Sequence, residues 1–222
     1  MLYEIFDHMH LCTDEAVREM LPLVSEQRRQ QALRYSHTFG RFCCLKSYLM
    51  LLELLSAVYP ELDTSKPEFG YTAQGKPFLL ARPDIHFSIS HTKNAILVAI
   101  SDAPIGVDIE AFRSPSAALI ARTMNATEQA AIATADGWNI HRTPGTREAH
   151  LEQPQASGTP EGLFSAIWTR KEAVLKLRGT GIEGDLKHVL SGSEAIFTRI
   201  FPRKSYAFSI AQQSISPFEI LH

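Results

Sequence analysis

The sequence predicts an α+β protein in which helices are followed by strands. From Phe164 to Leu175, apolar residues recur at about 100° per residue, the period of a helix with one buried face. From Ile85 to Ile89 and from Ile105 to Glu110, apolar residues alternate with others, as in half-buried strands. Helix followed by strands occurs in both halves of the chain, which indicates an internal duplication. We therefore expect two similar halves, residues 1–104 and residues 105–222.

Other segments fit this class. Residues 2–11 alternate loosely and predict a strand, whereas residues 42–59 are apolar nearly all round and predict a buried helix. Residues 71–80 predict two strands joined by a tight turn at Gln74-Gly75. The segment 95–100 predicts a further strand.

Composition excludes several classes of partner. The chain has 222 residues, 45% of them hydrophobic, which suits one large globular domain or two small ones. The formal net charge of -2 lacks the basic excess typical of proteins that bind nucleic acids or membrane surfaces. We expect neither kind of partner.

The cysteines and the N-terminus indicate a cytoplasmic protein. The cysteines Cys12, Cys43 and Cys44 are odd in number and contain no CxxC spacing, so they predict neither a disulfide framework nor a zinc site. The first eight residues have no basic region and no long apolar core, so we expect no signal peptide.

A basic helix lies in the first half. Ser25 is a suitable N-cap for a helix that runs through Arg34 and carries Arg28, with Arg41 close behind. These arginines could form a solvated cationic face. They fit an anion site equally well, since the guanidinium fork matches phosphate oxygens.

Two acids share one face of a predicted strand. Because Ile105, Val107 and Ile109 point one way, Asp108 and Glu110 point the other, with Cα atoms about 6.6 Å apart. Paired carboxylates suit magnesium, which takes one or two of them together with substrate phosphates. A solvent-facing edge strand would also explain the charges, but not Gly106, which leaves space for something close.

The helix of the second half carries charges on its buried side. Lys171 falls within the apolar face, Glu172 lies at the edge, and Lys176 follows four residues later. A buried cation needs an anion beside it. Gly179 and Gly181 predict the end of the helix.

A capping box and a long polar segment precede that helix. Asn125 and Glu128 have capping-box spacing, so we expect a structural role for Glu128. Residues 136–162 are polar and without periodicity, and predict a long loop.

Together the motifs resemble a known family. In chain order they are Gly75-Lys76-Pro77, Phe87–His91, Gly106–Glu110, Trp168–Lys176 and Gly179–Gly181. This combination resembles the Sfp-type (surfactin-synthetase-activating) 4′-phosphopantetheinyl transferases. The resemblance implies two α+β halves related by a pseudo-twofold axis, with coenzyme A between them.

The implied activity is transfer of the phosphopantetheine arm of coenzyme A to a serine of an apo acyl or peptidyl carrier protein. The reaction would need Mg²⁺ and would release adenosine 3′,5′-bisphosphate. The resemblance implies a monomeric protein in fatty-acid, polyketide or nonribosomal-peptide biosynthesis.

The resemblance also implies roles for individual residues. Magnesium would be held by Asp108, Glu110 and Glu172. Lys171 and Lys176 would offset phosphate charge, and Glu172 would activate the serine, with Glu128 and a metal-bound water left open as other proton acceptors. The remaining coenzyme A contacts would be Gly75, Lys76 and Pro77 at the adenine, Ser90 and His91 at the phosphates, and Arg28 with Arg41 near the 3′-phosphate. Gln31 stands where a second cation is common.

Two other functions use the same residues. A magnesium-dependent phosphoesterase or nuclease of the Asp…Glu-x-Lys type would need a lysine where Phe112 stands. A catalytically silent protein that binds coenzyme A or carriers would lack an acid or a lysine, and Asp108, Glu110, Glu172, Lys171 and Lys176 are all present.

Overall fold

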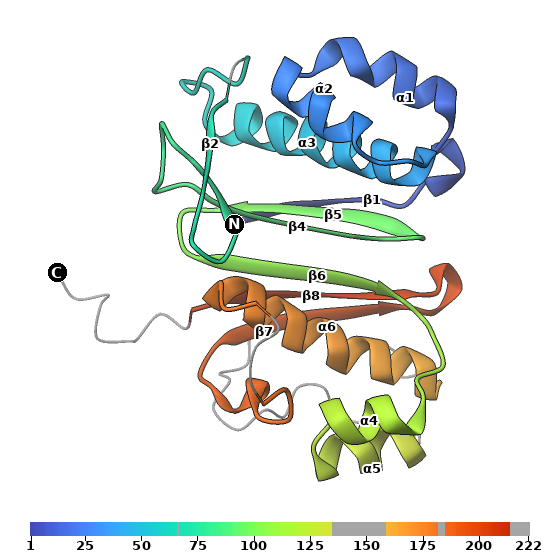
Figure 1. Cartoon of the computed structure of the whole chain (residues 1–222). Helices are drawn as coiled ribbons and strands as arrows, with labels where there is room; N and C mark the ends of the chain where they lie inside the picture. Colours follow the sequence, from blue (N-terminus) through green and yellow to red (C-terminus); the bar gives the residue numbers. More distant parts are fainter. Residues whose placement is uncertain (66, 135–158, 182–184, 214–222) are drawn as a thin grey trace, which may run out of the picture. The chain divides into compact units, whose positions relative to one another are not determined.

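The computed structural model describes residues 1–65, 67–134, 159–181 and 185–213 (Figure 1). Contacts divide the chain into two compact units, Met1–Asp102 (unit 1) and Ala103–His222 (unit 2). Both combine helices with antiparallel sheets, which confirms the predicted α+β class. None of the helices in the described ranges is both long enough and apolar enough to cross a bilayer.

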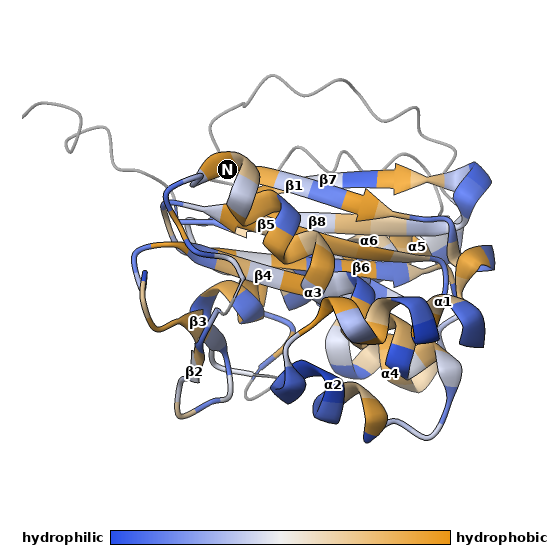
Figure 2. Ribbon diagram, turned by 90° about the horizontal axis from the view of Figure 1, so that it is seen from above, coloured by the Kyte–Doolittle hydropathy of each residue, from blue (hydrophilic) through white to orange (hydrophobic). Residues whose placement is uncertain are grey.

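The described part of unit 1 contains one strand, three α-helices with two short 3-10 helices (Met9–Leu11 and Leu21–Leu23), and then four strands. In chain order the strands and α-helices are β1 (Leu2–Phe6), α1 (Asp14–Met20), α2 (Glu26–Leu33), α3 (Thr38–Val58), β2 (Phe69–Tyr71), β3 (Pro77–Leu79), β4 (His86–Thr92) and β5 (Ala95–Ser101). Three strands form an antiparallel sheet in the order β1-β5-β4, and β2 pairs with β3. The apolar sequence of β5 places it at the centre, where every residue is buried, and α3 shares its core. The polar α2 contrasts with β5 in hydropathy (Figure 2).

Two element boundaries in unit 1 differ from the prediction. The strand predicted over residues 2–11 ends at Phe6, and Met9–Leu11 forms a short 3-10 helix. The helix predicted from residue 42 begins at Thr38, because Nδ1 of His37 accepts the Gly40 N–H at 3.0 Å and caps the first turn.

Unit 2 repeats this order of elements. It contains β6 (Ile105–Ala111), α4 (Ala117–Thr123), α5 (Ala126–Thr134), α6 (Pro160–Arg178), β7 (Ala195–Phe201) and β8 (Tyr206–Gln212). The antiparallel sheet has the order β6-β8-β7. In each unit, therefore, the first strand is followed by helices and then by a hairpin whose second strand becomes the centre of the sheet.

The ends of α6 follow from its capping residues. Thr159 Oγ1 accepts the Gly162 N–H at 3.2 Å, and Pro160 occupies the first helical position. The predicted loop over residues 136–162 is therefore wrong at its C-terminal end, and the remainder, up to residue 158, lies outside the described residues. Gly179 has φ 70° and ends the helix as predicted.

Candidate functional site

Small residues let α6 lie directly on the sheet of unit 2. The sheet face below the helix carries Gly106 paired with Ala211, Asp108 with Ser209 and Glu110 with Ala207. A Cβ atom on Gly106 would lie 2.1 Å from the carbonyl oxygen of Ala173 and 2.3 Å from the nitrogen of Leu177. The space left by Gly106, which we expected to admit something close, is filled by the helix itself. The absent side chain is what lets α6 approach the acids of β6.

This approach joins Asp108 of β6 to Lys176 of α6. The Lys176 Nζ donates to Asp108 Oδ1 at 2.7 Å. The Asp108 side chain is 7% exposed and that of Lys176 is 34% exposed, so the pair opens to solvent on the lysine side. Lys176, predicted to face a phosphate, thus already lies among the predicted metal-binding acids.

Glu110 and Glu172 complete an acidic cluster with Asp108. Burial raises the pKa of Glu110, and the charge of Asp108 raises it further, against opposing effects of Arg113 and Lys176. Burial likewise raises the pKa of Glu172, followed by the charge of Asp108. The charge of Asp108 thus adds to burial in raising the pKa of both glutamates, an effect that a cation would relieve.

The donor chemistry of this cluster fits a magnesium ion. Three carboxylates are hard oxygen ligands of the type that Mg²⁺ takes. Within the described ranges, no three acidic, histidine or cysteine side chains already converge as a metal-ligand group. The set predicted as metal ligands, Asp108, Glu110 and Glu172, therefore remains a prediction, supported by the charge of its members and by their influence on one another's pKa values.

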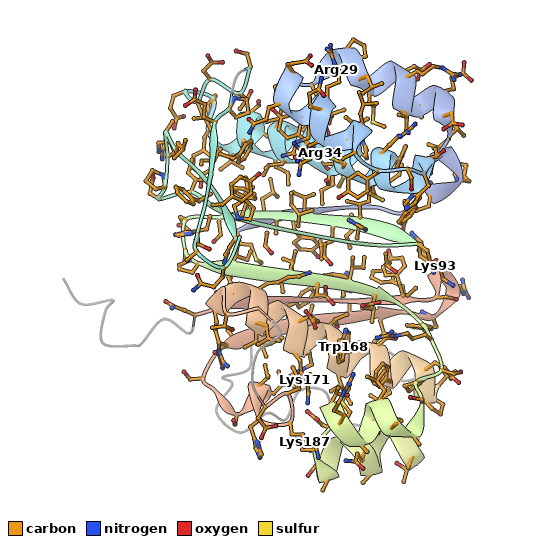
Figure 3. The ribbon with its side chains drawn as sticks, viewed as in Figure 1. Arg29, Arg34, Lys93, Trp168, Lys171 and Lys187 are labelled. Atoms are coloured by element: carbon orange, nitrogen blue, oxygen red, sulfur yellow. The ribbon has the colours of Figure 1, made fainter. Side chains whose placement is uncertain are left out.

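An aromatic pair on α6 borders Glu110. The rings of Phe164 and Trp168 stack with centroids 6.1 Å apart, and the Arg113 guanidinium lies 5.7 Å from each ring centroid. The Trp168 side chain, labelled in Figure 3, lowers the pKa of Glu110 against the effect of burial. The sequence analysis did not predict Arg113 as a neighbour of this site. The feature that could have indicated it is its position three residues after Glu110.

Lys171, labelled in Figure 3, is buried on α6 and bonded to Glu128 of α5. Its side chain is 1% exposed, and its Nζ donates to Glu128 Oε2 at 2.7 Å. It also donates to the carbonyl oxygens of Thr123 at 2.7 Å and Leu186 at 2.8 Å. Burial lowers the pKa of Lys171, and the bond to Glu128 opposes this effect. The anion that the sequence required beside Lys171 is Glu128 in this structure, and contact with a phosphate remains a prediction.

The capping box at α5 is confirmed. The Asn125 N–H donates to Glu128 Oε2 at 2.8 Å, and the Glu128 N–H donates to Asn125 Oδ1 at 2.9 Å. Glu128 is 2% exposed. The sequence predicted this structural role but did not reveal the ion pair with Lys171, 43 residues away.

In unit 1, Arg28 lies in a pocket. Its guanidinium is 4.4 Å from the ring centroid of Tyr48, a cation–π contact. The other lining residues are Ser25, Gln27, Gln31, Pro67, Phe69 and Tyr71. Arg41, predicted beside Arg28, donates from Nε to the Tyr35 carbonyl oxygen at 2.9 Å.

The other predicted coenzyme A contacts also belong to unit 1. Gly75 has φ 83° in the turn between β2 and β3, as predicted, and Pro77 begins β3. Burial lowers the pKa of Lys76. Ser90 is buried within β4, and the exposed His91 packs edge-on against Phe39, with centroids 6.0 Å apart. Their contacts with coenzyme A stay predictions.

Comparison with known proteins relates this chain to a protein family. Residues 104–213, nearly the whole described part of unit 2, match the model of the 4′-phosphopantetheinyl transferase superfamily. A 4′-phosphopantetheinyl transferase of Bacillus subtilis is 26% identical over 181 residues, which cover 82% of this chain and 71% of the relative. The 4′-phosphopantetheinyl transferase psf-1 of Bacillus pumilus is 26% identical over 75% of this chain and 62% of the relative. The transferase Sfp of Bacillus subtilis strain 168 is 25% identical over 82% of this chain and 71% of its own length. Together with the acids and lysine that α6 and β6 bring together, these similarities show that the chain belongs to the 4′-phosphopantetheinyl transferase superfamily.

Proposed function

We propose that this protein transfers the 4′-phosphopantetheine arm of coenzyme A to a serine of an apo carrier protein. The observation that carries the proposal is the cluster of Asp108, Glu110, Glu172 and Lys176 within the unit that matches the superfamily. In the reaction, the serine oxygen bonds to the phosphorus that bears the pantetheine arm. The bond from that phosphorus to the bridging oxygen breaks, and adenosine 3′,5′-bisphosphate leaves.

The acids and Lys176 supply the electrostatic part of this chemistry. Asp108, Glu110 and Glu172 would hold Mg²⁺, which offsets negative charge on the pyrophosphate when bound. Lys176 lies against Asp108 and is one-third exposed, so its ammonium can turn to a phosphate oxygen without crossing the core. Charge neutralisation of this kind is generally the largest contribution to such transfers.

Glu172 is the proton acceptor that we assign to the serine. Its raised pKa favours proton uptake, and it is only partly buried. Glu128 is less suitable because its carboxylate is buried, bonded to Lys171 and to the Asn125 N–H. A water held by the metal is the alternative proton acceptor. The test of Glu172→Gln below distinguishes it from Glu172.

Unit 1 would contribute the contacts to the nucleotide of coenzyme A. Arg28 in its pocket suits the 3′-phosphate, and Arg41 is the second predicted contact. The remaining predicted contacts in unit 1 are Gly75, Lys76, Pro77, Ser90 and His91. We propose a monomer that acts in the cytoplasm, where Cys12, Cys43 and Cys44 stay reduced, as they are here.

Mass spectrometry of a carrier protein tests the proposal. Incubation with an apo acyl or peptidyl carrier, coenzyme A and Mg²⁺ is expected to add one phosphopantetheine arm to the carrier. A carrier with its serine replaced by alanine and a reaction with a chelator are the negative controls. If several unrelated apo carriers gain no mass while coenzyme A still binds, the protein is a binding protein and not a transferase.

The variant Glu172→Gln tests the base. It is expected to fold and to lose transfer by about 10²–10⁴-fold, the usual contribution of a general base together with a lost metal ligand. The pH profile separates the two proton acceptors. If the residual transfer rate of Glu172→Gln still falls at low pH as the wild-type rate does, the proton acceptor is metal-bound water and not Glu172.

A further inference from the structure

The ammonium of Lys171 has a complete set of acceptors inside unit 2. A lysine ammonium has three N–H donors. Those of Lys171 meet the oxygens of Glu128, Thr123 and Leu186, at 2.7, 2.7 and 2.8 Å. The side chain is 1% exposed and that of Glu128 is 3% exposed. A phosphate oxygen could bond to Lys171 only by displacing one of these partners.

The three acceptors belong to three different segments. Thr123 is the last residue of α4, Glu128 lies in the first turn of α5, and Leu186 lies in the segment that follows α6. Glu128 is itself fixed by the Asn125 N–H, and Asn125 Nδ2 donates to the Lys187 carbonyl oxygen at 3.4 Å. One ammonium therefore links α6 to both neighbouring helices and to the segment at residues 186–187 (Figure 3).

Lys171 and Gly106 hold α6 from two sides. The backbone of Ala173 and Leu177 lies against Gly106 of β6, while Lys171 is bonded towards α4 and α5. Glu172 comes between these anchors in the sequence, one helical turn before Lys176, which bonds to Asp108 of β6 at 2.7 Å. Since successive helical residues differ by about 100°, a rotation of α6 that released Lys171 would also turn Glu172 away from the acids.

We propose that Lys171 is a positioning residue that fixes the rotation of α6 and so aims Glu172 at Asp108 and Glu110, and that it is not a ligand of coenzyme A. This inference rests on the proposed transferase function for its kinetic consequences. Its structural part, the coupling of Lys171 to Glu128, stands on the geometry of unit 2 alone.

Steady-state kinetics with the full chain distinguish positioning from phosphate binding. In Lys171→Met we expect kcat to fall by about 100-fold, the cost of a small misplacement of reacting groups, with KM for coenzyme A within about twofold of the wild type. Lys176→Met, altered on the same helix but at a lysine whose side chain is 34% exposed, is the matched control. It is expected to raise KM for coenzyme A and to lose less stability in urea than Lys171→Met, since the ammonium of Lys176 is partly in solvent.

The double variant Lys171→Met/Glu128→Gln keeps the test valid if the single variant folds poorly. It removes both charges of the pair, so no carboxylate is left buried without its cation. We expect its urea midpoint to lie above that of Lys171→Met, and its kcat to recover partly. Direct Mg²⁺ titration by calorimetry gives a readout besides activity, since weaker binding in Lys171→Met would report a displaced Glu172.

Opposite results would overturn the proposal. One is a Lys171→Met variant whose KM for coenzyme A is raised more than about tenfold while its kcat and urea midpoint are unchanged. The other is wild-type kinetics in Lys171→Arg, because the larger guanidinium would suit a phosphate but not this enclosed site. If the wild type transfers nothing to any carrier, the proposed function fails. The urea double-mutant cycle and the Mg²⁺ titration then still test the positioning role.

Discussion

Two lysine–acid pairs in the described part of unit 2 differ in their access to solvent. In Lys171–Glu128 both side chains are enclosed, whereas in Lys176–Asp108 the lysine is 34% exposed. Removing one partner of an enclosed pair leaves a buried charge and costs about 3–5 kcal/mol. An exposed lysine is held less strongly, since solvent screens it. The first pair is therefore suited to structure and the second to a ligand.

At the second pair, replacing Lys176 should affect metal and substrate in opposite directions. In Lys176→Met, removal of a cation beside Asp108 is expected to strengthen Mg²⁺ binding in the absence of coenzyme A, because like charges no longer repel. Phosphopantetheine transfer should fall. Calorimetric titration with Mg²⁺ measures the first effect and carrier mass the second. Lys176→Arg keeps the charge and should bind Mg²⁺ like the wild type; tighter binding in Lys176→Arg would contradict this explanation.

Cys43 provides a prediction for alkaline pH. Burial raises the pKa of this thiol to about 12, with smaller effects from Cys12 and Cys44. In the unfolded chain the thiol ionises near its ordinary pKa of about 8.5. Between these values the folded state holds one more proton, so the free energy of unfolding falls as pH rises, by up to about 1.4 kcal/mol per pH unit. Urea unfolding from pH 8 to 11 should show a shallower decline in Cys43→Ala; equal slopes would mean that the thiol does not contribute.

At the scale of elements, the contact of α6 with β6 depends on Gly106. In Gly106→Ala the new Cβ meets backbone atoms of α6, which cannot rotate away as a side chain would. We expect a loss of roughly 3 kcal/mol and loss of transfer, because the helix must move off the acids. Urea unfolding measures the first effect and carrier mass the second.

The matched control is Gly162→Ala in α6 itself. There the Cβ meets the ring of Phe112 at 3.2 Å, and a ring can shift. Alanine also favours the helix over glycine, so stability should stay within about 1 kcal/mol of the wild type. Equal losses in Gly106→Ala and Gly162→Ala would show that the β6 contact is not special.

The cap of α5 gives a second prediction at this scale. Asn125→Ala removes the acceptor of the Glu128 N–H and the 3.4 Å bond to the Lys187 carbonyl oxygen. We expect a loss of about 1 kcal/mol or more in urea unfolding. Ser116→Ala removes a comparable cap, the 3.2 Å bond from the Leu119 N–H at α4, without a distant contact. It should cost less than Asn125→Ala, and the reverse order would argue against a role for the Lys187 contact.

For the molecule as a whole, the acidic cluster links stability to pH and Mg²⁺. The raised pKa values of Glu110 and Glu172 mean that their ionised forms destabilise the fold. This contribution to stability is complete below the ordinary glutamate pKa of about 4.3 and is lost as pH rises through the raised values. Mg²⁺ binds the ionised forms, so the rise in Tm that it causes should be small near pH 4.5 and larger at pH 7. Asp108→Asn should reduce this rise, and an undiminished rise would place the ion elsewhere.

Local patterns predicted most of the fold and the residues of the candidate site. Alternation in β6 predicted the shared face of Asp108 and Glu110, the spacing of Asn125 and Glu128 predicted the capping box, and Gly179 marked the end of α6. These features depend on neighbouring residues, so a sequence pattern contains them. The start of α3 was missed because a histidine cap is not a usual signal.

Only the tertiary structure decided what each charged residue meets. The sequence determined that Lys171 lies in an apolar face and needs an anion, but not that the anion is Glu128, 43 residues earlier. The sequence indicated that something approaches Gly106 closely, but it did not reveal that α6 fills that space. It likewise gave no sign that Lys176 bonds to Asp108, 68 residues away. Periodicity specifies which side of an element is buried, whereas the partner on that side depends on how distant elements pack.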